Sequence, residues 1–153
     1  MIISFAGHST LPHDARIKDF IKKQLQNIIA RNAAITCYLG GYGDFDNLCA
    51  QVCRELKQEF SHIELVYVTP YITISEQSKI KEMEQYHLYD SSIYPPIENT
   101  PPKFAVLKRN EWMMGQADVV IAYVSHSYGG AYKSIQEAMR KRKTIINIFE
   151  LIK

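Results

Sequence analysis

The sequence has few of the features that mark specialised classes of protein. It contains three cysteines, with no Cys-x-x-Cys pair and no His-rich partner segment, so neither a disulfide framework nor a zinc site is expected. Its longest apolar runs, such as 119–124, fall far short of the ~18 residues that span a bilayer. The first residues lack the basic and apolar regions of a signal peptide. We therefore expect a cytoplasmic protein with no membrane contact, no metal and no cofactor.

Charge of one sign is also scarce. Eighteen Lys and Arg against sixteen Asp and Glu leave a net charge of +2, with both signs mixed along most of the chain. A nucleic-acid partner is therefore not expected, because proteins that coat a polyanion usually carry a broad basic face. The single basic cluster, 140–143, closes a predicted helix, where cations complement the helix dipole. Contact between this cluster and nucleic acid is the alternative.

Short apolar runs alternate with amphipathic stretches, a pattern typical of strands and helices that take turns. The predicted strands cover 1–6, 34–39, 63–69, 118–124 and 144–149. Two helices are predicted to start at Asp14 and Asp46, which are suited to be N-caps. Two further helices are predicted over 104–116 and 133–143. This order predicts an α/β fold of the three-layer, Rossmann-like kind, with a mostly parallel five-stranded sheet covered on both faces. A length of 153 residues fits one domain over 1–153.

The segment 71–102 departs from this pattern. It holds a polar helical stretch near 76–86, and five of the six prolines when Pro70 just before it is counted. Because prolines and an exposed polar helix are unsuited to a central strand, we expect an irregular insertion or a lid here.

Polar and glycine-rich loops follow three of the predicted strands. Their sequences are Gly7-His8-Ser9-Thr10, Gly40-Gly41-Tyr42-Gly43-Asp44-Phe45-Asp46 and Ser125-His126-Ser127-Tyr128-Gly129-Gly130. The carboxyl ends of parallel strands share one edge of a sheet, where ligands bind. Glycine turns that open helices present free backbone N–H groups to an anion such as phosphate. A dinucleotide fingerprint is incomplete, because Asp46 stands where its third glycine would be, and there is no P-loop.

Several side chains near this edge are open to two interpretations. Arg109 is either a bidentate phosphate ligand or an exposed helix cation, and Asp46 either a helix N-cap or a ribose ligand. His8 and His126 are hydrogen-bond or proton donors to a ligand, or ordinary loop residues. Three tyrosines near the glycine turns offer rings for stacking: Tyr42, Tyr128 and Tyr132. The adjacent Trp112, Met113 and Met114 cover more than one helix face, which predicts a surface for self-association.

The second half of the chain resembles the SLOG superfamily, which has a Rossmann-like fold. The resemblance rests on 109–124, followed by Gly129-Gly130 and Ala138. In the first half, Phe5-x-Gly7-His8, Gly40-Gly41 with Phe45-Asp46, and Val68-x-Pro70-Tyr71 are similar to the YpsA-like group. More distant relatives are the LOG phosphoribohydrolases and the DprA core.

The resemblance implies a pocket for a nucleotide or nucleotide-derived small molecule, and a homo-oligomer, expected to be a dimer. The expected ligand-binding residues follow the loops: Gly7, His8, Ser9, Gly40, Gly41, Asp46, Arg109, Ser125, His126, Gly129, Gly130 and Lys133. LOG enzymes cleave the N-glycosidic bond of nucleoside monophosphates with an arginine, matched here by Arg109, and a glutamate, where this chain has Gln136 or its neighbours. We therefore expect a binding or sensing module. The alternatives are an N-glycosidic hydrolase with Arg109 and Glu111 or Asp46 as catalytic residues, and a DprA-like nucleic-acid module.

Overall fold

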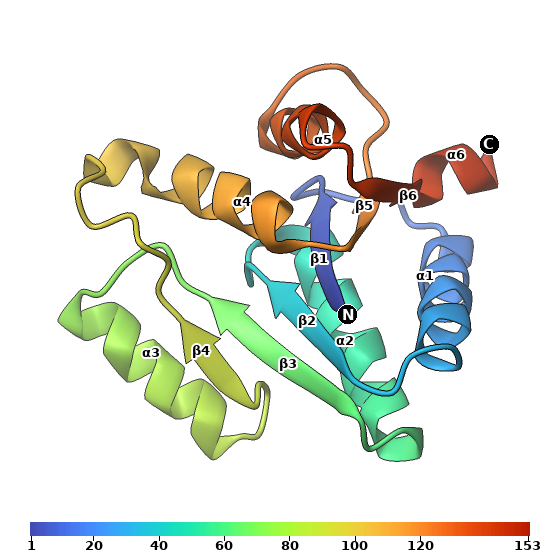
Figure 1. The fold of residues 1–153 in the computed structure, drawn as a ribbon, viewed down its shortest axis with the longest axis horizontal. Helices are drawn as coiled ribbons and strands as arrows, with labels where there is room; N and C mark the ends of the chain where they lie inside the picture. Colours follow the sequence, from blue (N-terminus) through green and yellow to red (C-terminus); the bar gives the residue numbers. More distant parts are fainter.

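All 153 residues are described by the computed structural model, which has six strands (Figure 1). The strands are β1 (Ile2–Gly7), β2 (Ile35–Leu39), β3 (Ile63–Val68), β4 (Ser91–Ile93), β5 (Val119–Tyr123) and β6 (Thr144–Asn147). The helices are α1 (Ala15–Ile29), α2 (Gly43–Glu59), α3 (Ile74–Gln85), α4 (Ala105–Gln116), α5 (Gly130–Arg140) and α6 (Ile148–Ile152), with a short 3-10 turn at Pro102–Phe104. None of the helices has the length and apolar character needed to span a membrane.

The strands form one all-parallel sheet in the order β4-β3-β2-β1-β5-β6. β1 lies in the middle of the sheet, with Ile3 opposite Cys37 of β2 on one side and Val119 of β5 on the other. The chain progresses outward from β1 in both directions, so the strand order reverses between β1 and β5. Ligands bind beside such a reversal, at the carboxyl ends of the strands.

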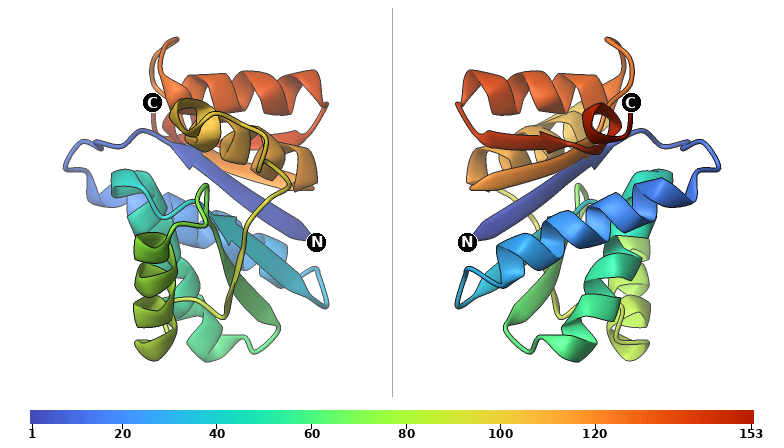
Figure 2. Two further views of the ribbon diagram at one scale, coloured as in Figure 1. Left: turned by 90° about the vertical axis from the view of Figure 1, so that its left-hand side faces the viewer. Right: turned by 90° about the vertical axis from the view of Figure 1, so that its right-hand side faces the viewer.

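Helices cover both faces of the sheet, as Figure 2 shows with α4 and α5 on one side of β1 and with α1 and α2 on the other. A core of 21 buried residues lies on the side of α1, α2 and α6 and includes Cys37, Cys49 and Cys53. A second core of 12 buried residues lies beneath α4 and α5. Met113 and Met114 are buried in it, and Trp112 stacks on Tyr38 with ring centroids 5.5 Å apart. Exposure of the two methionines is therefore contradicted, because both pack inward, while self-association through this helix stays a prediction.

The insertion contains more regular structure than the sequence indicated. Its short strand β4 joins the edge of the sheet beside β3, where the carboxylate of Asp90 accepts the N–H of Leu65 at 2.7 Å and forms an ion pair with Lys57. A strand of three residues is too short to show a hydrophobic period in the sequence. It forms because of contacts with residues that are distant in the chain. The sheet consequently has six strands where five were expected. The expected final strand ends early, because the side chain of Asn147 caps α6.

Helix α3 contributes no buried side chain. Its main attachment is Glu76, whose carboxylate accepts the hydroxyl of Tyr67 at 2.6 Å and that of Thr69 at 3.1 Å. The helix lies beside β4 at the edge of the sheet (Figure 1). Helix α3 is therefore anchored by a few polar contacts, whereas β4 pairs with β3, and Tyr89 and Ile93 pack against the two cores.

Candidate functional site

A cavity of about 360 Å³ opens at the carboxyl edge of the sheet, beside the reversal between β1 and β5. Its walls come from the end of β1 and its loop, the first turn of α2, the first turns of α4, and the loop that leads into α5. Among the lining residues are Gly7, His8, Ser9, Thr10, Tyr42, Asp46, Arg109, Asn110, His126, Tyr128, Gly129, Gly130 and Ser134. Segments far apart in the sequence thus meet at the edge that the strand pattern predicts.

The glycine turn before α5 leaves the amino end of that helix open to the cavity. Gly129 has φ +88°, a conformation that favours glycine, and no side chain caps the helix that begins at Gly130. A Cβ at Gly130 would have no neighbouring atom within 4 Å, so there is space around this turn. Backbone N–H groups and the positive end of the helix dipole therefore face an open space suited to an anion.

The amino end of α2 is a poor anion site by comparison. The N–H of Asp44 donates to the backbone oxygen of Ser9 at 2.9 Å, and the N–H of Tyr42 donates to the carboxylate of Asp46 at 3.2 Å. Two acidic side chains already occupy the first turn of this helix. Of the two glycine turns in the sequence, only the one before α5 is free to hold a negative group.

Asp46 was predicted to be an N-cap, and that prediction is wrong. The helix begins three residues earlier, with Tyr42 as its N-cap, and Asp46 turns its carboxylate toward the cavity. Burial raises the pKa of Asp46 to about 6, against the opposing effects of the Tyr42 N–H and the positive charge of Arg109. A carboxyl group with such a pKa gains and loses its proton close to neutral pH, as is common at functional sites.

Arg109 is buried within α4, with 3 % of its surface exposed, rather than displayed on the helix surface. Its Nη1 donates to the carbonyl oxygens of Gly40 at 3.0 Å and Val68 at 2.8 Å, and its Nε donates to Asn110 at 2.8 Å. The guanidinium thus holds the ends of β2 and β3 against α4. Its Nη2 has no hydrogen-bond partner in the protein, and Arg109 is among the residues that line the cavity. Burial lowers the pKa of Arg109, while the carboxylate of Asp46 counteracts this effect.

Three aromatic rings form a stack along one wall of the cavity. The rings of His8 and His126 lie 3.8 Å apart between centroids, and those of His126 and Tyr128 also lie 3.8 Å apart. The Nε2 of His8 accepts the N–H of Ser125 at 2.9 Å, so the proton of the neutral ring is on Nδ1. Burial, and then the charge of His126, lower the pKa of His8. The Nδ1 of His126 is buried without a hydrogen-bond partner.

The structure brings together eight of the expected ligand-binding residues around the cavity: Gly7, His8, Ser9, Asp46, Arg109, His126, Gly129 and Gly130. Gly40 and Gly41 lie behind it, because Gly40 faces the guanidinium of Arg109 and Gly41 faces the ring of Tyr67. Ser125 and Lys133 are exposed, and neither lines the cavity. Glu111 is paired with Lys108 on α4 and is likewise outside the lining. The ligand-binding roles of all these residues remain predictions.

Sequence reasoning did not single out Asn110 and Ser134, which also line the cavity. Asn110 accepts the Nε–H of Arg109, and the Ser134 hydroxyl donates to the carbonyl of Gly130 at 3.1 Å. The only sequence signal for either was its spacing, one residue after Arg109 and one helical turn after Gly130. His, Cys, Asp and Glu side chains do not gather anywhere into a group of three that could hold a metal ion.

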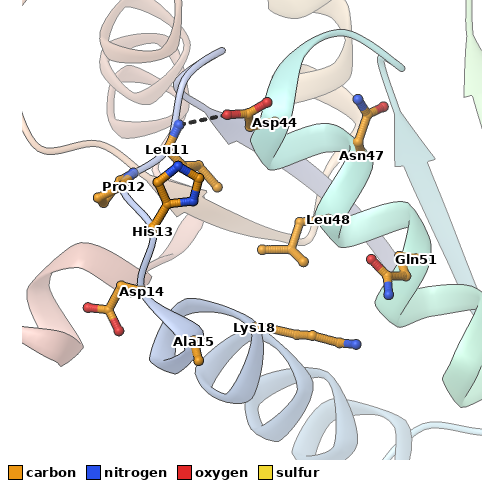
Figure 3. Close-up of a pocket in the computed structure, with 10 residues that line it drawn as sticks. All are labelled: Leu11, Pro12, His13, Asp14, Ala15, Lys18, Asp44, Asn47, Leu48 and Gln51. Atoms are coloured by element: carbon orange, nitrogen blue, oxygen red, sulfur yellow. Dashed lines mark hydrogen bonds between the residues drawn. The ribbon is translucent and has the colours of Figure 1, made fainter.

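A second, open cavity of about 570 Å³ lies beside the later part of the loop that follows β1 (Figure 3). It is bounded by the start of α1 and by Asn47, Leu48 and Gln51 of α2. The Asp44 carboxylate accepts the N–H of Leu11 at 3.0 Å and so holds this loop against α2. Asp44 and Asp46, two residues apart, therefore serve different cavities: the first shapes the loop and the second lines the candidate site.

The six-stranded parallel sheet with its central β1 and two helical layers defines a Rossmann-like α/β protein. The chain belongs to the YspA SLOG family, whose family model, YpsA, matches residues 9–150. This membership agrees with the resemblance carried by the loops that follow the strands. No curated protein matches the chain in sequence.

Solved structures of DNA processing protein A share the fold. The X-ray structure of the Streptococcus pneumoniae protein superposes with a TM-score of 0.63 at 16 % identity, covering 94 % of this chain and 48 % of that one. The Helicobacter pylori protein, described in terms of its single-stranded DNA binding mode, gives 0.62 at 16 % identity, covering 95 % of this chain and 63 % of that one. This chain thus spans less than two thirds of either relative, and the likeness establishes the fold alone.

Proposed function

We propose that the protein binds a nucleotide or nucleotide-derived small molecule in the cavity beside β1 and β5, as a binding or sensing module. The observation that carries the proposal is the uncapped amino end of α5, which opens into a cavity at the point where the strand order reverses. Membership of the SLOG family, a family of nucleotide-related binding modules, supports the same ligand class.

The proposed anion site has two sources of positive potential. Backbone N–H groups from Gly130 onward provide one, and the Nη2 of Arg109 provides the other. Asp46 lies in the same cavity and is suited to accept a hydrogen bond from a ribose hydroxyl. The site thus offers hydrogen-bond donors for a phosphate and an acceptor for a sugar hydroxyl, and a nucleotide carries both of these groups.

Gly130→Asp provides a sharp test of the anion site. An aspartate side chain has space at this position, and negative residues are favoured in the first turn of a helix, so the variant is expected to fold normally. Its carboxylate would repel a phosphate from the N–H groups of α5. Calorimetric titration with nucleoside mono-, di- and triphosphates, cyclic nucleotides and ADP-ribose is expected to show binding to the parent protein and loss of at least tenfold in Gly130→Asp.

Gly130→Asn is the matched neutral control and should retain at least part of the affinity. Mass spectrometry of small molecules released on denaturation of the purified protein identifies any ligand that copurifies. If no nucleotide-derived compound binds the parent protein or is released from it, the proposed function is wrong.

A second candidate is hydrolysis of the N-glycosidic bond of a nucleoside monophosphate. Asp46 favours it, since this carboxyl group lines the cavity with a pKa of about 6, whereas Glu111 is outside it. In that reaction water adds to C1′, and the bond from C1′ to the base nitrogen breaks with its electron pair going to the base. The water proton passes to the Asp46 carboxylate, and the departing base nitrogen takes up a proton from solvent. If the parent protein releases free base from a nucleoside monophosphate and Asp46→Asn does not, the hydrolase is supported. If the nucleotide binds and no base is released, the protein is a binding module.

A nucleic-acid module of the DprA kind has less support. The basic run 140–143 lies at the end of α5, on the opposite edge of the sheet from the cavity, and both Arg140 and Lys141 pair with Glu137. If the protein were such a module, it would bind single-stranded DNA with an affinity that falls steeply as the salt concentration rises. We expect no such binding.

A further inference from the structure

We propose that the ring stack His8–His126–Tyr128 is a platform on which the flat heterocycle of the ligand adds as a fourth ring, against the exposed face of Tyr128. The inference rests on the proposed function and specifies the ligand further. It specifies a compound in which an aromatic base is joined to an anionic group; a phosphorylated sugar without a base would bind through the anion site alone, and more weakly.

The stack is closed at one end and open at the other. At the closed end, the ring of His8 meets the edge of Tyr123, with centroids 6.2 Å apart and the ring planes at 84°. At the open end, Tyr128 has one face covered by His126 at 3.8 Å and is nevertheless 69 % exposed. A further ring can therefore join the stack only on the outer face of Tyr128.

The platform is held in position before a ligand arrives. The Ser125 N–H donates to His8 at 2.9 Å and ties the loop after β5 to the loop after β1. Stacking within His8, His126 and Tyr128 then orients the tyrosine ring. Because a rigid aromatic surface loses little conformational entropy on binding, a pre-stacked tyrosine is a better base platform than a mobile one.

The position of Tyr128 also fits the anion site. Tyr128 directly precedes the Gly129-Gly130 turn, and all three residues line the cavity. A ligand whose phosphate lies on the N–H groups of α5 thus has its attached base within reach of this ring.

Tyr128→Leu tests the platform, with ribose 5-phosphate as a probe that lacks the base. Stacking of a base on an aromatic side chain contributes on the order of 1–3 kcal/mol, or roughly five- to 150-fold in affinity. We expect Tyr128→Leu to weaken binding of a nucleoside monophosphate by about tenfold or more, while affinity for ribose 5-phosphate is unchanged. Tyr128→Phe should retain the affinity, because the ring and not the hydroxyl is required.

Two further tyrosines provide controls. Tyr86 is 63 % exposed at the end of α3 and does not line the cavity, so Tyr86→Leu should have no effect. Tyr42 is 73 % exposed and lines the cavity, so it is the competing platform. In NMR spectra, the protons of the bound base should shift upfield with the parent protein and lose this shift with Tyr128→Leu.

The outcomes separate the two proposals. Loss of base affinity in Tyr42→Leu but not in Tyr128→Leu would overturn the platform and leave the proposed function intact. Equal losses for nucleotide and ribose 5-phosphate in Tyr128→Leu would also overturn it, because the defect would then lie in the anion site. If the parent protein binds neither probe, the proposed function itself fails.

Discussion

The guanidinium of Arg109 lies so close to Gly40 that residue 40 has no room for a side chain. A Cβ at residue 40 would lie 3.0 Å from the Cζ of Arg109, and the Gly40 carbonyl accepts the Nη1–H of that guanidinium at 3.0 Å. The same Nη1 donates to Val68 at the end of the neighbouring strand. Arg109 is consequently part of the framework as well as part of the cavity wall.

Replacing Arg109 with methionine is expected to destabilise the protein by about 2–3 kcal/mol, because two buried carbonyl groups lose their donor. Urea unfolding followed by circular dichroism measures the difference. Lys108→Met is the matched control on the adjacent, exposed position, and it should change the stability by less than about 0.5 kcal/mol. Equal midpoints for Arg109→Met and the parent protein would show that the guanidinium does not hold the strand ends.

Gly43 and Gly130 both open helices but differ in their tolerance of a side chain. At Gly43, φ is +89° and a Cβ would lie 2.6 Å from the Cα of Ser9, so Gly43→Ala should cost about 1–3 kcal/mol of stability and displace the loop after β1. At Gly130 a Cβ meets no atom within 4 Å, so Gly130→Ala is expected to be neutral or slightly stabilising. Thermal unfolding of the two variants checks the contrast; a tolerated Gly43→Ala would contradict it.

Asp46 should make the protein less stable as the pH rises. Its pKa is about 6 in the folded protein and about 3.9 in an unfolded chain, so the folded state binds more protons between these values. The stability contribution of the protonated carboxyl is full below about pH 4 and is lost as the pH rises through 6. The shift corresponds to at most about 3 kcal/mol. Asp46→Asn should therefore raise the melting temperature at pH 7.5, by a few degrees, and not at pH 4.

His8 should act in the opposite direction. Burial and the nearby His126 lower the pKa of His8, so the unfolded chain binds the proton more readily. Stability should thus fall as the pH drops below about 6.5, the value for unfolded histidine, and through the lower pKa of the folded state. Over part of the same pH range, the stabilising contribution of Asp46 increases as the pH falls. The dependence of stability on pH in the parent protein is therefore the sum of two opposing effects. In Asp46→Asn we expect the loss of stability below about pH 6.5 to become visible, and in His8→Asn we expect it to be absent. If the stability–pH curves of both variants run parallel to that of the parent protein, the assignment to Asp46 and His8 is wrong.

The longer strands and amphipathic helices were predictable because each buries a regular set of side chains, as with the fully buried strand 119–123 beside β1. β4 and α6 were not, since each is short and depends on partners elsewhere, Leu65 and Val124 among them. In the site, the position of the loops followed from the strands. The inward turn of Arg109 and the exclusion of Glu111 did not, because helix phase alone does not say which face meets the cavity.

The ring stack shows the same limit. His8 and His126 belong to loops 118 positions apart, and only the pairing of β1 with β5 places their rings face to face. A single sequence gives no signal for such a contact. Asp46 was singled out from its place after a strand, yet its role as an N-cap was wrong because the helix began one turn earlier, at Gly43.

The central place of β1 has a consequence for how the chain folds. β1 precedes the other strands of this sheet in the chain and pairs with β5, and the Ile2 N–H donates to the Asp118 carboxylate at 2.7 Å across a separation of 116 residues. Contacts of such long range close large loops and slow folding. During translation β1, β2 and β3 can pair early, whereas the second edge of β1 stays unpaired until β5 has left the ribosome. Until then the nascent protein exposes the unpaired N–H and C=O groups along one edge of β1, and the stacked rings of His8 and His126 have not yet come together.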